Sequence, residues 1–198
     1  MSDATLLTDL FHQLAGRWKL DRKLQSADDT EPSGQCDGFA TLTPREPCVV
    51  MDGEGKLNTA DAEMLYHEQG EFQIAAVALG HGGDPRFRFS RKYIWRLSKE
   101  FEGPSISIWF TKPGTETIDY LFHKVDMARD RAGRDEKREI QLHGTGGHLC
   151  VDDYYSSFYS FIFTANPESN TVLSSWSMTH EVRGPQKDQV IETTFTRG

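Results

Sequence analysis

The chain alternates apolar and polar residues in short segments, and this two-residue period recurs along most of its length. Side chains of an extended strand point alternately to opposite faces, so the alternation predicts strands that bury one face of a sheet. Clusters of turn-forming residues separate the segments. The predicted strands are 17–22, 37–43, 62–69, 71–78, 87–97, 105–110, 117–125, 139–142, 149–165, 172–179 and 190–196.

Residues 5–15 depart from this pattern, because Leu7, Leu10, Phe11 and Leu14 follow helical spacing. They predict one short helix ahead of the first strand. The later segments show no strand–helix–strand rhythm, which indicates an antiparallel up-and-down meander, and closure into a barrel would remove its exposed edges. The predicted fold class is therefore all-β: a single antiparallel barrel of about 8–10 strands with a short N-terminal helix.

Composition and charge limit the classes of partner that we expect for this chain. A chain of 198 residues without a linker pattern predicts one domain over 1–198. The formal net charge of −8 disfavours nucleic acids and anionic membranes, so a small molecule is the expected partner, with a homodimer as a possible assembly. Three cysteines without a CxxC pair argue against a disulfide framework or structural zinc. Reduced thiols and the lack of a signal-peptide pattern predict a cytoplasmic protein.

The stretch 147–159 gathers the residue types that acid–base chemistry uses. His148 is the candidate proton carrier, Asp152 or Asp153 could orient its imidazole, and Tyr155 or Arg91 could stabilise a developing oxyanion. Read as one continuous strand, the stretch puts His148 on the face opposite Asp153 and Tyr155, so this catalytic set requires a bulge. A nucleophilic Cys150 would need an exposed thiol with a lowered pKa, whereas cysteine usually packs as a small hydrophobe.

The predicted strand 87–97 places Arg91, Tyr93 and Trp95 on one face together with further apolar residues. An inward arginine among aromatic rings is suited to hold the carboxylate or enolate of a largely apolar ligand. Arg91 is therefore the predicted anchor, with Tyr93 and Trp95 as walls. The structural alternative is that Arg91 pairs with a buried aspartate and only fixes packing.

Three further residues complete the predicted ligand-binding set: His123 in an aromatic strand, Cys150 and Trp176. Trp176, like Trp18, could instead fill the end of a small barrel. The histidines match no standard metal spacing, so neither a metal nor a cofactor is predicted, and haem on one axial histidine is the weaker alternative.

Four blocks of residues occur in order along the chain: 14–18, 91–96, 148–150 with Asp153 and Tyr155, and Trp176 with 183–188. The first contains Gly-x-Trp after a short helix, which resembles the opening of lipocalin and fatty-acid-binding (calycin) barrels. Together the blocks resemble, more specifically, a lipocalin-like family of unknown function, family 6314, found in bacteria and fungi. The resemblance implies a lipocalin-like barrel and no activity. Asp153 and Tyr155 are preferred to their neighbours for the catalytic set only because they belong to the third of these blocks. The polar loop 26–34 and the charged stretch 126–138 are longer than the family pattern needs, and we expect the charged stretch to be a solvated loop or a helical turn.

Three functions stay open at this point. The first is a barrel that binds a small, partly aromatic or carboxylated organic molecule. The alternative is a cofactor-independent isomerase, cyclase or lyase that uses histidine, aspartate, tyrosine and arginine side chains. The third is a haem-binding or protein-interaction barrel. Barrels of this kind can host each of these functions, so the fold alone cannot choose among them.

Overall fold

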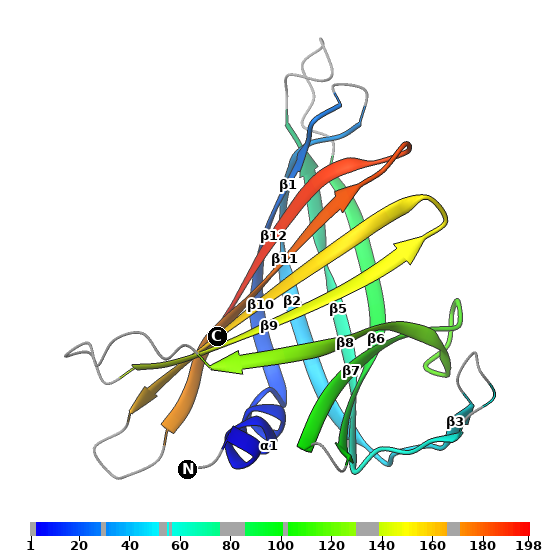
Figure 1. Ribbon diagram of the computed structural model, residues 1–198. Helices are drawn as coiled ribbons and strands as arrows, with labels where there is room; N and C mark the ends of the chain where they lie inside the picture. The colour runs from blue at the N-terminus through cyan, green and yellow to red at the C-terminus, as the bar shows by residue number, and fades with distance from the viewer. Residues whose placement is uncertain are drawn as a thin grey trace.

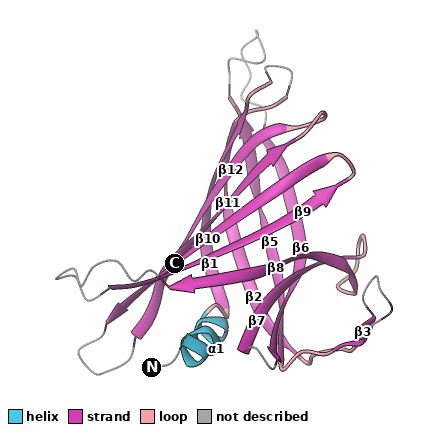
Figure 2. Cartoon of the chain, viewed as in Figure 1, coloured by secondary structure: helices cyan, strands magenta, loops and turns pink. Residues whose placement is uncertain are grey.

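The chain folds into a closed antiparallel barrel of ten strands, with one helix at one end (Figure 1). The computed structural model describes residues 3–28, 31–51, 55, 57–75, 86–100, 103–129, 139–165 and 171–198. Strand dominates the described chain, as Figure 2 shows. The predicted all-β class, the antiparallel barrel and the short leading helix are confirmed. The elements are α1 (Asp3–Gln13), β1 (Gly16–Ser26), β2 (Gly34–Arg45), β3 (Val50–Met51), β4 (Leu57–Asn58), β5 (Ala62–Ile74), β6 (Arg86–Glu100), β7 (Gly103–Thr111), β8 (Ile118–Arg129), β9 (Glu139–Cys150), β10 (Asp153–Ala165), β11 (Thr171–Arg183) and β12 (Asp188–Arg197).

The barrel is an up-and-down meander in which consecutive strands pair from β5 to β12, and β1 pairs with both β2 and β12. That last pairing closes the sheet, so each of the ten strands has two neighbours and the barrel has no free edge. The exception to simple succession lies between β2 and β5, where β3 and β4 form a separate two-stranded sheet. In the described chain, no helix is long and apolar enough to cross a membrane.

Aromatic rings fill the half of the barrel next to α1. Trp176 stacks on Phe195 with ring centroids 3.6 Å apart, and Trp18 and Trp95 meet Trp176 edge-on. These rings are at most 2% exposed. The Trp18 indole donates a hydrogen bond to the Leu14 carbonyl at 2.8 Å, which ties the helix end to the first strand. The buried face of α1 consists of Leu6, Leu7, Leu10 and Phe11, and Leu14, just after the helix, is buried as well.

A second, smaller core lies outside the barrel wall, where the segment that carries β3 and β4 packs on the outer face. The fully buried Arg96 of β6 holds it there: its Nε donates to Glu63 at 3.0 Å, and its guanidinium also donates to Asn58 Oδ1 at 2.7 Å. A Cys48 carbonyl accepts a further bond from the same side chain. The apolar residues of this outer core are Ile94, Trp109 and Ile118, with Cys48, Val50, Leu65 and Leu121 against them.

Several predicted strand limits need correction. The strands predicted at 62–69 and 71–78 form one strand, β5, which ends at Ile74, and residues 76–78 lie outside the described residues. The stretch 126–138, expected as a loop or helical turn, is strand as far as Arg129, and 130–138 lie outside the described residues. The polar loop 26–34 lies between β1 and β2 as predicted.

The largest correction concerns the predicted strand 149–165, which is two strands of a hairpin. β9 ends at Cys150, Val151 and Asp152 form the turn, and β10 begins at Asp153. Cys150 and Asp153 are therefore directly opposed, as are His148 and Tyr155. Opposed residues share a face, so the turn brings His148 and Tyr155 to one face of the sheet, an arrangement that the sequence predicted to require a bulge. The sequence hides this turn because neither turn residue is glycine, asparagine or proline.

The hairpin turn stores backbone strain at Val151. Its φ of 57° is one that β-branched residues rarely adopt, and it occupies the first turn position, where glycine is preferred in type II′ turns. We expect Val151→Gly to raise the free energy of unfolding by about 1 kcal/mol, because lost strain outweighs the added entropy of the unfolded chain. Urea unfolding measures the change. Asp152→Gly is the matched control and should lower stability, and an equal loss in both variants would contradict the strain.

Candidate functional site

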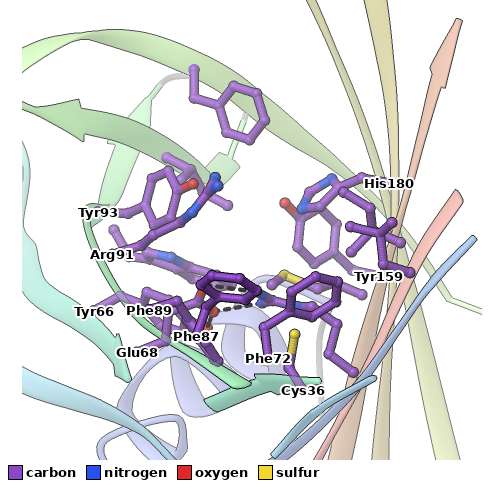
Figure 3. A pocket seen from close by; sticks show the side chains of 17 residues that line it. Cys36, Tyr66, Glu68, Phe72, Phe87, Phe89, Arg91, Tyr93, Tyr159 and His180 are labelled. Atoms are coloured by element: carbon purple, nitrogen blue, oxygen red, sulfur yellow. Dashed lines mark hydrogen bonds and ion pairs between the residues drawn. The ribbon is translucent and has the colours of Figure 1, made fainter. Parts of the chain in front are cut away.

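Above the tryptophan floor, the half of the barrel away from α1 holds a cavity of about 310 Å³. Figure 3 shows its lining in close view. A cavity of this volume is at the small end of ligand sites, which favours a compact ligand with one or two rings. Much of its wall is aromatic, with Tyr66, Phe72, Phe87, Phe89, Tyr93 and Phe122 among the lining residues.

A buried ion pair crosses one side of the cavity. Arg22 of β1 donates to both carboxylate oxygens of Glu68 of β5, at 2.9 and 2.6 Å, and Tyr66 donates to Glu68 at 2.6 Å. The remaining guanidinium nitrogen, Arg22 Nε, donates to Thr193 Oγ1 at 2.9 Å. Thr193 is the residue directly opposite Arg22 on β12. The Glu68 side chain is only 2% exposed. Each polar group of this network therefore has a partner inside the protein.

Electrostatics keep this pair charged. Burial alone would raise the pKa of Glu68, but the Arg22 charge and the hydrogen bonds from Arg22 and Tyr66 outweigh burial, so the pKa lies below 4.5. Burial likewise opposes the charge on Arg22, yet Glu68 raises the pKa of Arg22 above its ordinary value. Glu68 also raises the pKa of Tyr66, after the larger effect of burial, so the phenol keeps its proton and donates it.

Arg91 of β6 lines the same cavity and lies directly opposite Glu68 in the strand register. Arg91 is an exposed residue overall, and its side chain shares a hydrogen bond with Tyr93. Tyr93 and Glu68 together raise the pKa of Arg91, although burial opposes them. Because Glu68 already has two bonds from Arg22, the two arginines and one glutamate leave one net positive charge in the cavity.

Histidine and hydroxyl side chains form a second polar wall. Ser157 Oγ of β10 and His180 Nδ1 of β11 are 2.8 Å apart, and Tyr159 OH lies 2.8 Å from His123 Nε2. His180 and Tyr159 line the cavity on the side opposite Arg91 and Tyr93 (Figure 3). Burial lowers the pKa of His180 to about 4, with Arg22 adding to the effect, and lowers the pKa of His123 to about 3. Both imidazoles are therefore neutral at pH 7.

A β-bulge in β8 turns His123 inward. Ile108 of β7 pairs with His123 while Trp109 pairs with Leu121, so Phe122 is the extra residue, and both Phe122 and His123 are buried. A Cβ at Gly146 would lie 2.3 Å from the His123 ring, so the close approach requires glycine. The His123 Nδ1 atom is buried without a hydrogen-bond partner. His123 thus lies behind the cavity wall and reaches it through Tyr159.

The structure brings His148 and Tyr155 together but gives Asp153 other contacts. The His148 and Tyr155 ring centroids are 6.5 Å apart, and His148 forms a hydrogen bond with the Phe122 backbone. Asp153 Oδ1 accepts a hydrogen bond from the backbone N–H of Gln186 at 3.1 Å, which ties β10 to the β11–β12 turn. In the part of the chain that is described, the lining of the 310 Å³ cavity includes none of His148, Asp153 and Tyr155. Their catalytic role stays a prediction.

Some of the other predicted ligand-binding residues line the cavity, and others lie elsewhere. Arg91, Tyr93 and Trp95 line the cavity, as the alternation in 87–97 predicted for one face of the strand. Trp176 lies in the aromatic floor, and Cys150 is exposed at the hairpin end. A different thiol, Cys36, lines the cavity, and burial raises the pKa of this thiol, which makes it a poor nucleophile at neutral pH.

The lining residues that sequence reasoning missed include three with charged or imidazole side chains: Arg22, Glu68 and His180. Each continues the inward alternation of its strand, since Arg22 follows Trp18 and Leu20 at two-residue spacing. A charged or titratable residue on an otherwise apolar face was therefore the signal that could have found them. Their partners could not be read from the chain, because Arg22 and Glu68 are separated by 46 residues.

Residues 14–197 match the model of a protein family described as a family of unknown function, DUF6314. The chain belongs to the DUF6314 family. This confirms the resemblance to that family, while kinship with the lipocalin and calycin barrels stays a prediction with which the closed antiparallel barrel agrees. Comparisons with curated proteins and with solved structures found no match. A DUF6314 protein inherits no activity from its family description, so the function has to be argued from the cavity.

The neutral histidines predict how stability depends on pH. In the unfolded chain an imidazole binds a proton below about 6.5, whereas His180 in the fold does so only below about 4. The unfolded state thus binds more protons in this window, and we expect the free energy of unfolding to fall as pH decreases from 6.5 to 4. Each such histidine contributes a slope of about 1.4 kcal/mol per pH unit.

Urea unfolding at a series of pH values checks this expectation. His180→Gln should reduce the slope by about 1.4 kcal/mol per pH unit. His12→Gln, which changes an exposed histidine of α1, should leave the slope unchanged. Equal slopes for the wild type and His180→Gln would show that His180 titrates normally in the fold.

Proposed function

We propose that this barrel binds a small aromatic molecule with one carboxylate, and that the carboxylate pairs with Arg91. The observation that carries the proposal is the charge balance of the cavity: the Arg22–Glu68 pair is internally satisfied, and Arg91 remains as the net cation beside aromatic rings. An apolar wall with one fixed charge is the common design of a small-molecule site. The overall charge of −8 supports a small ligand over a nucleic acid.

Arg91 suits the role better than Arg22. The three guanidinium nitrogens of Arg22 already donate to Glu68 and Thr193, so a ligand would have to break a buried network. Arg91 shares a hydrogen bond with the phenol of Tyr93 and is an exposed residue, so it can exchange water for a carboxylate at low cost. A guanidinium also offers two parallel N–H donors to a carboxylate.

The test is binding of 3-phenylpropanoate, measured by isothermal titration calorimetry. Loss of a hydrogen bond to a charged group costs about 1.5–3 kcal/mol, so Arg91→Gln should weaken binding tenfold or more. Arg88→Gln is the matched control: it makes the same charge change on the same strand, on the outer face. Equal weakening in both variants would reduce the effect to long-range charge, and unchanged affinity in Arg91→Gln would remove Arg91 from the site.

A second candidate function is cofactor-independent acid–base catalysis, favoured by one observation: a neutral imidazole, His180, lines the cavity across from Arg91. With a 2-oxo acid bound, His180 would take a proton from the carbon beside the carbonyl. The C–H electrons would form the enolate, whose oxygen Arg91 would stabilise. Transfer of the proton from His180 to the enolate oxygen would complete a keto–enol isomerisation, and its return to carbon would give back the starting acid; either outcome leaves the protein unchanged.

Deuterium exchange at the methylene carbon of phenylpyruvate, followed by proton NMR in heavy water, tests this candidate. We expect the wild type to accelerate exchange above the buffer rate, and His180→Gln to remove the acceleration while phenylpyruvate still binds. Binding of phenylpyruvate without acceleration by the wild type would exclude proton transfer by His180 and leave the protein as a binder.

A further inference from the structure

The second polar wall of the cavity has no role in holding a carboxylate. His180, Ser157 and Tyr159 come from β10 and β11, and Figure 3 shows His180 and Tyr159 across the cavity from Arg91. Tyr159 OH already meets His123 Nε2, and His180 Nδ1 already meets Ser157 Oγ, so a ligand that offered only a carboxylate and an apolar ring would give no partner to the second ring nitrogen of His180. Buried polar groups without partners cost free energy, so the wall selects for a ligand that carries a second polar group.

The strand register orients His180. Ser157 and His180 are direct partners in the β10–β11 ladder, and Ser157 Oγ lies 2.8 Å from His180 Nδ1. Ser157 is 1% exposed, so this contact is protected from water. The contact occupies one ring nitrogen of a side chain that lines the cavity, and it leaves Nε2 as the atom that can meet a ligand.

The charge of the cavity decides what the second group is. A cation beside His180 would be repelled by Arg22 and Arg91, whose charges already act against protonation of His180. A second carboxylate would lack a partner, because the lining offers a single net positive charge and a neutral imidazole. The second group is therefore neutral. A hydroxyl fits in either tautomer of the ring, since it can donate to an unprotonated Nε2 or accept from a protonated one.

We propose that the ligand class of this barrel is the hydroxylated aromatic acids, with the carboxylate on Arg91 and the hydroxyl on His180. This inference rests on the proposed binding function and adds the second recognition point to it. The aromatic part of the ligand then lies between the two walls and spans the distance between the ligand's carboxylate and its hydroxyl. The ring faces contact Phe89 and Phe122, which line the cavity as well.

The experiment compares two ligands that differ by one hydroxyl: 3-phenylpropanoate and 3-(4-hydroxyphenyl)propanoate. Their flexible linkers let the ring adjust to the distance between the walls. Titration calorimetry on the wild type should show about three- to tenfold tighter binding of the hydroxylated acid, the factor that one net hydrogen bond provides. Equal binding of the two acids, or tighter binding of 3-phenylpropanoate, would overturn the inference without any variant.

Two variants separate recognition from packing. His180→Phe should abolish or reverse the preference for the hydroxylated acid, measured as the ratio of the affinities of the two acids for the same variant. His180→Gln keeps a donor and an acceptor and should retain part of the preference. A preference that survives intact in His180→Phe would assign the hydroxyl to another residue and overturn the proposal.

The same titrations distinguish this inference from the function beneath it. If neither acid binds the wild type, the binding proposal itself fails, and the hydroxyl site fails with it. If both acids bind equally and Arg91→Gln weakens both tenfold or more, the carboxylate site stands and the hydroxyl site alone is wrong. Weakening of both acids by Arg91→Gln together with a preference that depends on His180 supports the two sites jointly.

Discussion

The stack of Trp176 on Phe195 is the contact on which the rest of the barrel depends, because it decides how much of the lumen is filled. Trp18 and Trp95 meet this stack edge-on, and α1 covers it from the end of the barrel. Four large rings at nearly zero exposure supply the apolar burial that a ten-stranded barrel needs for stability. The opposite half of the lumen is thereby released from a packing role and can stay open for a ligand.

A buried ion pair lies in that open half, and its desolvation has to be weighed against its hydrogen bonds. Arg22 and Glu68 lose hydration, and such pairs add little net stability against apolar replacements. What the pair does provide is a defined charge: each guanidinium nitrogen of Arg22 donates one hydrogen bond, and both carboxylate oxygens of Glu68 accept one from it. Among the described lining residues, Arg91 then supplies the net positive charge of the cavity.

Sequence reasoning succeeded where alternation was long and uninterrupted. The strand 87–97 was read correctly as an aromatic inward face with Arg91, since eleven residues without a break fix the parity of every side chain. It failed where the break carried a weak local signal: the turn at Val151 and Asp152 contains no glycine, asparagine or proline, and the bulge at Phe122 depends on the pairing with β7. One-residue changes of this kind invert every later face assignment, which is why the faces of 147–159 were misjudged.

Both polar walls arise from residues that are direct partners in the barrel ladder, Glu68 with Arg91 and Ser157 with His180. Direct partners on one face have Cβ atoms about 5 Å apart, so the ladder positions these side chains before any ligand arrives. Such preorganisation lowers the cost of binding, because the protein does not have to order its own polar groups. A closed ladder with an aromatic floor therefore gives this DUF6314 protein a site whose two ends are fixed in space and whose chemistry differs at each end.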